Sequence, residues 1–108
     1  MKLSEVIDET FKPVFETDLN REVNSCYIGD LLSFVMANGK EGCLWLTVQK
    51  HLNVIAVAEL NDFAGVIFVQ DNYPEADTIK KAKELDIPLF TTALDAYQVA
   101  KHLCKKGL

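Results

Sequence analysis

The chain has 108 residues, of which 49% are hydrophobic and 25% are charged, a composition typical of a soluble domain with one core. Its formal net charge of −5 argues against binding to nucleic acid or to a membrane surface, because both are negatively charged. The first ten residues lack the apolar run of a signal peptide, and no apolar stretch approaches the roughly 20 residues that cross a bilayer. Three cysteines cannot all pair within the chain, so we expect reduced thiols and a cytoplasmic protein.

The N-terminal segment, residues 1–23, predicts a short helix followed by an edge strand. Ser4–Glu9 is the expected helix and Lys12–Glu16 the expected strand. Pro13 places this strand at an edge of the sheet, because proline has no N–H to donate to a neighbouring strand. A polar connection, Asp18–Val23, then leads into the rest of the chain.

Residues 24–108 predict four units in which a strand is followed by a helix. The expected strands are Asn24–Gly29, Cys43–Val48, Gly65–Val69 and Pro88–Thr91, and the expected helices are Asp30–Asn38, Leu52–Leu60, Pro74–Leu85 and Leu94–Lys106. Such alternation is typical of a parallel sheet, and uninterrupted apolar strands indicate burial on both faces. We therefore predict a single α/β domain with a mostly parallel sheet of four or five strands and helices on both faces.

Three of the expected helices carry further signals. Thr92 and Asp95 predict a capping box for the last helix, whose core face would hold Leu94, Tyr97, Ala100, Leu103 and Cys104. Pro74 is expected in the first turn of the third helix, whose core face would hold Ala76, Ile79, Ala82 and Leu85. The helix Leu52–Leu60 is apolar nearly all round, which predicts that it is central or covered by another chain.

The sequence contains no motif for phosphate, metal or nucleophile chemistry. It has neither the G-x-x-x-x-G-K-[ST] nor the G-x-G-x-x-G loop, and the Gly39–Gly42 stretch reads as a turn at the opposite end of the sheet from a nucleotide site. No histidine or cysteine pair has zinc spacing, and no nucleophile elbow is present. We therefore predict no cofactor, no bound metal and no catalytic residue. An enzyme with a dispersed site around His51 remains an alternative.

Polar residues follow every predicted strand. Ligands of parallel sheets bind at the carboxyl ends of the strands, near helix N-termini. The candidate ligand-binding or interface residues there are Gly29, Asp30, Gln49, Lys50, His51, Asn53, Gln70, Asp71, Asn72, Thr91 and Thr92. Capping and turn formation are the simpler interpretation of Asp30, Asn72 and Thr92. The residues that capping explains less well are Gln49, His51, Asn53 and Gln70.

Three stretches, GDLLSFVMANGKEGCLWLTVQ (residues 29–49), AGVIFV (64–69) and IPLFTTALDAYQVAKHL (87–103), resemble the DRTGG domain. The residues that name that family are largely absent. Lys50-His51 stand where the domain usually has an Asp-Arg pair, and Val69-Gln70-Asp71 stand where it has a Thr-Gly-Gly-like turn. The resemblance implies a fold similar to the N-terminal domain of HPr kinase/phosphorylase. Related domains occur beside phosphate acetyltransferase domains and within inorganic pyrophosphatases that contain nucleotide-sensing modules.

The resemblance and the lack of catalytic motifs together predict a non-catalytic regulatory module. Its leading mode of action is self-association, as a homodimer or other homo-oligomer, together with binding of a protein partner. The alternative is a sensor of a small molecule, a nucleotide or another anion, at the carboxyl ends of the strands.

Overall fold

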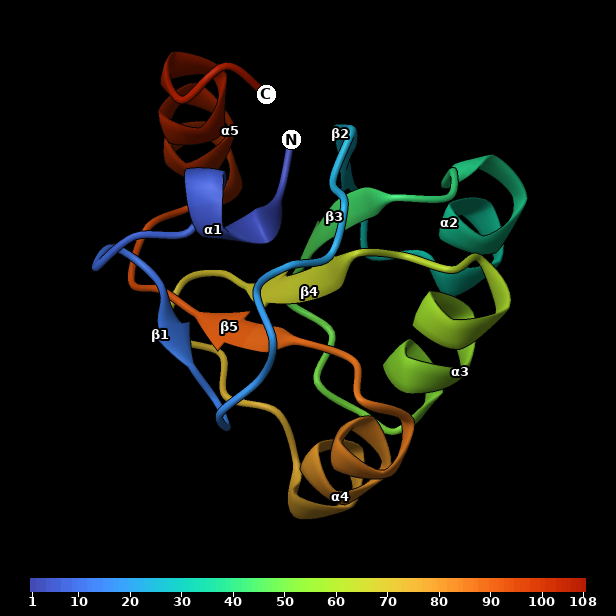
Figure 1. Ribbon diagram of the computed structural model, residues 1–108. Coiled ribbons are helices and arrows are strands. Elements are labelled where there is room, and N and C mark those ends of the chain that lie inside the picture. Colours follow the sequence, from blue (N-terminus) through green and yellow to red (C-terminus); the bar gives the residue numbers. More distant parts are fainter.

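A computed structural model describes residues 1–108 and contains one five-stranded sheet in the order β1-β5-β4-β3-β2 (Figure 1). The strands are β1 (Lys12–Pro13), β2 (Ser25–Ile28), β3 (Cys43–Thr47), β4 (Gly65–Phe68) and β5 (Leu89–Thr91). Strands β2 to β5 run parallel, and β1 pairs antiparallel with β5. The predicted mostly parallel α/β sheet is confirmed, and Pro13 lies on an edge strand.

The helices are α1 (Leu3–Val6), α2 (Leu32–Asn38), α3 (Asn53–Leu60), α4 (Ala76–Leu85) and α5 (Ala96–Lys105). Helices α2, α3 and α4 cover one face of the sheet, whereas α1 and α5 cover the other (Figure 1). The first three connect neighbouring parallel strands in one direction, and right-handed crossovers of that kind place their helices on the same face. Helix α5 follows the last strand and is free to cross to the opposite face.

Two hydrophobic cores lie on the two faces of the sheet because successive strand residues point in opposite directions. Trp45 and Val66 contribute to the core under α2, α3 and α4. Leu46 and Ile67, the next residues along, contribute to the core under α1 and α5. The Trp45 indole Nε1 donates to the carbonyl of Gly29 at 2.8 Å, so its one polar atom is satisfied within the core. The apolar strands are thus buried on both faces.

Helix α5 differs from its predicted form at its start and on its buried face. Its capping box is formed by Asp95 and Gln98, with Gln98 N donating to Asp95 Oδ1 at 2.8 Å. Thr92 instead accepts from the backbone N–H of Leu94 in the preceding turn. The buried residues are Val99 and Leu103. Of the predicted core face, Leu103 is buried and Leu94 packs half-buried against the same core. The prediction was wrong for Tyr97 and Cys104, which are exposed.

Helix α4 also starts later than expected. Its N-cap is Glu75, so Pro74 precedes the helix and is not in its first turn. Ala76 is exposed, and the fully buried residues are Thr78 and Ala82. Thr78 can be buried because its hydroxyl donates to the carbonyl of Lys50 at 2.9 Å.

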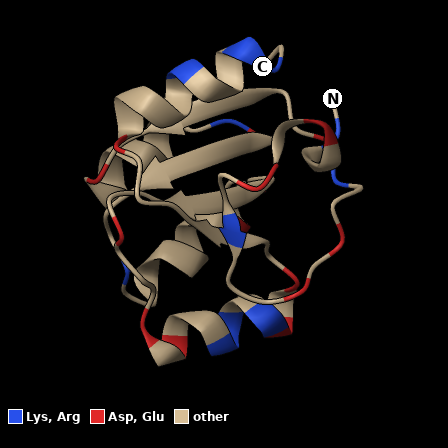
Figure 2. Ribbon diagram, turned by 90° about the vertical axis from the view of Figure 1, so that its left-hand side faces the viewer, with Lys and Arg blue, Asp and Glu red and all other residues tan.

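Helix α3 is the central helix of its layer, between α2 and α4. Its buried residues are Val54, Ile55, Val57 and Ala58, whereas Leu52 and Leu60 are 44% and 69% exposed. Cover from within the chain therefore accounts for one side of its apolar surface and not for all of it. The lysines of α4 and those of α5 lie at opposite sides of the molecule (Figure 2), and they form no common basic surface. No helix is both long enough and apolar enough to span a membrane.

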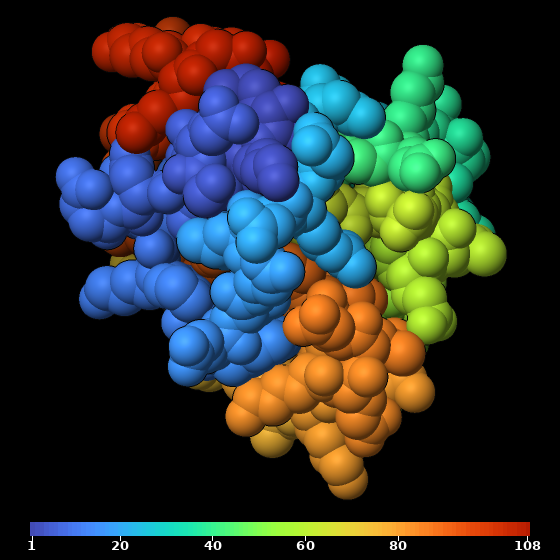
Figure 3. All heavy atoms as spheres, in the orientation of Figure 1, coloured from blue at the N-terminus to red at the C-terminus, as the bar shows by residue number.

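The N-terminal segment lies against α5 (Figure 3). Asp8 Oδ2 is 2.8 Å from His102 Nε2 and 2.9 Å from Lys106 Nζ. The ammonium of Lys106, with further hydrogen bonds from Thr10 and His102, holds the pKa of Asp8 well below its usual range. This ionic contact joins the two ends of the chain.

Candidate functional site

The carboxyl ends of β2 to β5 meet at one edge of the sheet, so the loops that carry the predicted residues share that edge. Gln49 and Gln70 follow the adjacent strands β3 and β4. The edge divides into two halves of different character. In the β2–β3 half, the side chains of Asp30 and Gln49 bond to the neighbouring loop, whereas several side chains in the β4–β5 half have no partner.

Asp30 and Gln49 hold the two loops of the β2–β3 half together. Asp30 Oδ1 accepts from the Thr47 hydroxyl at 2.8 Å and from the Val48 N–H at 2.9 Å. Gln49 Nε2 donates to the backbone carbonyl of Asp30 at 2.9 Å, and the Gly29 carbonyl accepts from Trp45. The polar groups of these three predicted residues are therefore engaged in structure. Asp30 braces a loop and does not cap α2, whose N-cap is Leu31.

His51 forms an exposed pair with a carboxylate. Its Nδ1 lies 2.8 Å from Glu75 Oε2, with 63% and 50% of the two side chains exposed. The Lys50 carbonyl accepts from the Glu75 N–H and the Thr78 hydroxyl, which ties this loop to the start of α4. His51 thus has the carboxylate that the enzyme alternative requires, but the pair lines none of the four cavities. Asn53 lies at the start of α3, beside a shallow groove facing α4.

The β4–β5 half contains a pocket of about 480 Å³. We call it the switch pocket, because the connections after β4 and β5 lead to opposite faces of the sheet there. Its volume is within the range of small-ligand sites, about 300–1,000 Å³. The residues that line it are Thr10, Lys12, Asp71, Tyr73, Thr91, Thr92, Ala93 and Leu94. Three of them, Asp71, Thr91 and Thr92, belong to the predicted set.

The switch pocket lies between two loops that diverge to opposite faces of the sheet. The loop after β4 leads to α4 on one face, and the loop after β5 leads to α5 on the other. Adjacent strands whose connections diverge in this way leave a crevice at their carboxyl ends, where parallel sheets bind ligands. Strand β1 supplies a third wall, because Lys12 is paired with Thr91 in the antiparallel register.

Four side chains in this pocket have polar groups with no partner in the protein. Lys12 makes no ion pair, and the side chains of Asp71, Tyr73 and Thr91 make no hydrogen bond within the chain. A cation, a carboxylate and two hydroxyls therefore surround one hollow and are available to a ligand.

The turn that carries Asp71 has an unusual backbone. Gln70 and Asp71 have φ of 57° and 59°, a left-handed conformation that costs most residues about 1–2 kcal/mol and glycine much less. Their N–H groups donate to the carbonyls of Leu94 and Thr92 at 2.9 and 3.0 Å, so the adjoining loop fixes the turn. Asn72 Nδ2 donates to the Val69 carbonyl at 2.9 Å. Gln70 and Asp71 are the positions where the DRTGG resemblance places Gly-Gly, and their backbone has the conformation that favours glycine.

Sequence reasoning missed five of the eight lining residues: Thr10, Lys12, Tyr73, Ala93 and Leu94. The predicted edge strand contained Lys12, but nothing in the sequence indicates that this strand pairs with β5. Tyr73 follows the predicted residues Gln70–Asn72 directly and could have been included with them.

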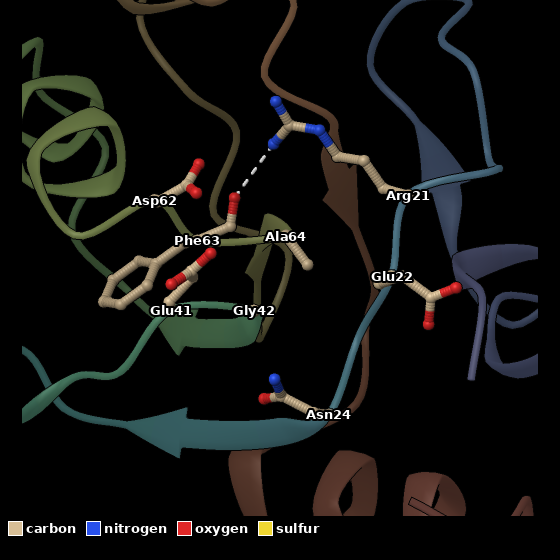
Figure 4. A pocket seen from close by; sticks show the side chains of 8 residues that line it. All are labelled: Arg21, Glu22, Asn24, Glu41, Gly42, Asp62, Phe63 and Ala64. Atoms are coloured by element: carbon tan, nitrogen blue, oxygen red, sulfur yellow. Dashed lines mark hydrogen bonds between the residues drawn. The ribbon is translucent and has the colours of Figure 1, made fainter.

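A second hollow, of about 490 Å³, lies at the opposite edge, where the strands begin (Figure 4). Arg21, the only arginine of the chain, donates from Nη1 to the Phe63 carbonyl at 2.9 Å. Three carboxylates, of Glu22, Glu41 and Asp62, also line the hollow. With three carboxylates against one guanidinium, this hollow is unfavourable for an anion.

Comparison with protein-family models and with curated proteins gave no match. Among solved structures, the chain is similar to the CBS and DRTGG domains of the regulatory region of Clostridium perfringens pyrophosphatase, which was crystallised with an activator, diadenosine tetraphosphate. The TM-score is 0.64 at 15% sequence identity, and the match covers 75% of this chain. It spans 35% of the regulatory-region chain in that structure, about a third of its length. This chain therefore has a fold related to that of a CBS and DRTGG regulatory region, in agreement with the fold that the resemblance implied.

Proposed function

We propose that this chain is a non-catalytic regulatory domain that senses a small anionic ligand of nucleotide type in the switch pocket. The observation that carries the proposal is the group of unpartnered side chains there, Lys12, Asp71, Tyr73 and Thr91, at the point where α4 and α5 diverge. Elsewhere on the same edge the predicted residues Asp30, Gln49 and His51 are engaged with one another or with Glu75.

Each free group matches one part of a nucleotide. The Lys12 ammonium can pair with a phosphate, and the exposed Tyr73 ring offers a surface on which a base can stack. The Asp71 carboxylate can accept from ribose hydroxyls, and the Thr91 hydroxyl can bind either part. Because one lysine and one aspartate line the pocket, its local charge suits a ligand with a single phosphate better than a polyphosphate.

The related regulatory region of the pyrophosphatase binds a dinucleotide activator, which supports a nucleotide as the ligand class. Identity of 15% transfers no binding residue, so the ligand assignment rests on the side chains described above. All three cysteines are free thiols, in keeping with a site of action in the reducing cytoplasm.

The test is a thermal-shift panel of adenosine, nucleoside mono-, di- and triphosphates, diadenosine tetraphosphate and inorganic phosphate. A ligand at 100 times its dissociation constant stabilises a protein by about 2.7 kcal/mol, which for a chain of this length corresponds to a Tm increase of about 12 °C. Lys12→Met and Tyr73→Ala should each reduce the shift. The matched controls, Lys101→Met and Tyr97→Ala on α5, should leave it unchanged. A shift that survives both pocket variants, or no shift with any ligand, would contradict the proposal.

Self-association is a second candidate function, and a specific observation favours it. Three large apolar side chains near the free edge of the sheet, Ile28, Leu31 and Phe34, are 50%, 66% and 61% exposed. Exposed apolar side chains gathered in one region indicate an interaction surface. A separate protein partner could use the same region.

A further inference from the structure

The two edges of the sheet differ in how they are protected against pairing with another strand. At one edge, β1 carries Lys12 and Pro13, a charge and a proline of the kind that blocks such pairing. At the other edge, β2 contains neither (Ser25–Ile28), and it has one neighbour, β3. An unprotected edge strand presents unpaired N–H and C=O groups to solvent.

The unpaired backbone groups of β2 can be assigned to particular residues. In a parallel pair, alternate residues direct their N–H and C=O groups to the same side. The Gly29 N–H donates to the Leu46 carbonyl of β3, so Tyr27, two residues earlier, also bonds toward β3. The N–H and C=O groups of Cys26 and Ile28 therefore face away from the sheet.

This spacing is self-complementary. If a second β2 pairs antiparallel with Tyr27 opposite its own copy, Cys26 of each strand lies opposite Ile28 of the other. In an antiparallel ladder, two opposite residues that direct their N–H and C=O groups toward the partner strand form two hydrogen bonds with each other. All four outward N–H groups of the two strands would then be bonded, and the two sheets would join into one.

The charge distribution favours a second copy of the chain as the occupant. The 17 residues from Val23 to Gly39 include a single charged one, Asp30, where the average composition of this chain would give about four. In the pairing described, two Asp30 residues are six strand positions apart, or about 20 Å, which is beyond the Debye length of about 8 Å. Two chains of charge −5 can therefore meet at this edge without placing like charges together.

Apolar side chains flank the edge on both faces. Tyr27 packs in the core under α2, and Cys26 packs in the other core, so Ile28 shares the face of Cys26 by strand alternation. Leu31, the N-cap of α2, and Phe34, in its first turn, are exposed apolar residues that follow this strand. Pairing of two β2 strands would place each Ile28 diagonally across from its copy, two strand positions along the ladder.

We propose that two copies of this chain form a symmetric dimer by antiparallel pairing of their β2 strands. The proposal rests on the self-association function and is independent of the switch pocket, at the far end of the strand order. Ligand-induced thermal shifts of the same variants test the sensor function separately. A loss of dimerisation with an unchanged thermal shift, or the reverse, shows which of the two proposals fails.

The experiment is sedimentation equilibrium of the full chain from low micromolar to millimolar concentration. The wild type should dimerise, and Ile28→Lys should raise the dimer dissociation constant at least about tenfold, because the twofold axis places the lysine at both ends of the contact. Tyr97→Lys, at an apolar residue of α5 that is 74% exposed, is the matched control and should dimerise as the wild type does. Circular dichroism verifies that each variant folds.

Amide hydrogen exchange on the wild type gives a second readout that needs no variant. The amides of Cys26 and Ile28 should exchange more slowly as protein concentration rises, whereas the amide of Tyr27, already bonded to β3, should be protected at all concentrations. A monomer at millimolar concentration would overturn the proposal. So would a dimer unaffected by Ile28→Lys, or one whose Cys26 and Ile28 amides stay unprotected.

Discussion

The left-handed turn after β4 should be strained, and replacement of both its residues by glycine should relieve that strain. Gln70 and Asp71 have φ of 57° and 59°, which costs about 1–2 kcal/mol for each non-glycine residue. Neither side chain bonds within the protein, so glycine removes no side-chain hydrogen bond. At each position, glycine offsets about 0.5–1 kcal/mol of the relieved strain, because it has more conformational freedom to lose when the chain folds. The double variant Gln70→Gly/Asp71→Gly should therefore be more stable by about 1–2 kcal/mol.

Urea unfolding followed by circular dichroism measures this difference, and calorimetry should show a Tm increase of about 4–9 °C. Gln70→Gly should supply the larger share, because aspartate tolerates the left-handed region better than glutamine does. The control is Gln49→Gly in the neighbouring loop. It loses the hydrogen bond to the Asp30 carbonyl and should reduce stability by about 1–2.5 kcal/mol.

The single variants also separate strain from ligand binding. Asp71→Gly should raise stability yet reduce the nucleotide-induced thermal shift, because Asp71 lines the switch pocket. Gln70→Gly should raise stability and leave the shift unchanged. If the double variant is no more stable than the wild type, the turn stores no strain and the reasoning from its φ angles is wrong.

Three further predictions concern the rest of the domain. Asp8→Asn should lower the free energy of unfolding by about 1–2 kcal/mol at neutral pH. The loss is no larger because Asp8, His102 and Lys106 are partly exposed to solvent, which weakens their interaction. Lys106 lowers the pKa of Asp8 in the folded state. The stability that the Asp8 carboxylate contributes is therefore present above its unfolded pKa of about 3.9 and is lost as pH falls. The urea midpoints of wild type and variant should converge in acid. Cys104 should react first with a thiol reagent at pH 8, because it is exposed, whereas burial raises the pKa of the Cys26 thiol to about 12; alkylation mapped by mass spectrometry checks the order. Trp45→Phe should cost about 1–3 kcal/mol in chemical denaturation, because it removes the hydrogen bond to the half-buried Gly29 carbonyl and part of a fully buried side chain.

The sequence predicted the elements well wherever pattern and burial agreed. The strand around Trp45 is buried at every position and apolar except for Thr47, and its end was placed within one residue. Prediction failed where a local hydrogen bond set the boundary. Thr92 and Asp95 are both good capping residues, and only the structure shows that the Thr92 hydroxyl is used in the turn before the helix. The buried face of α5 then followed from the wrong start, which is why Tyr97 was assigned to the core.

The candidate site shows the same division more sharply. The sequence placed polar residues at the carboxyl ends of four parallel strands, and the structure brings those ends to one edge. The sequence did not distinguish Gln49, which bonds to the Asp30 carbonyl, from Asp71, which lines a pocket. In both cases the sequence shows only a polar residue after a strand. Whether that side chain has a hydrogen-bond partner within reach depends on the tertiary structure.

The periodicity and composition of the chain by themselves determined its class, a parallel α/β sheet buried on both faces, because strands without polar residues are stable only between two layers of helices. The tertiary structure alone decided that α4 and α5 lie on opposite faces and that β1 joins the sheet beside β5. These choices depend on contacts between residues far apart in the chain, such as Asp8 with Lys106 and Lys12 with Thr91. No local pattern encodes such contacts, and they create both the switch pocket and the free edge of β2.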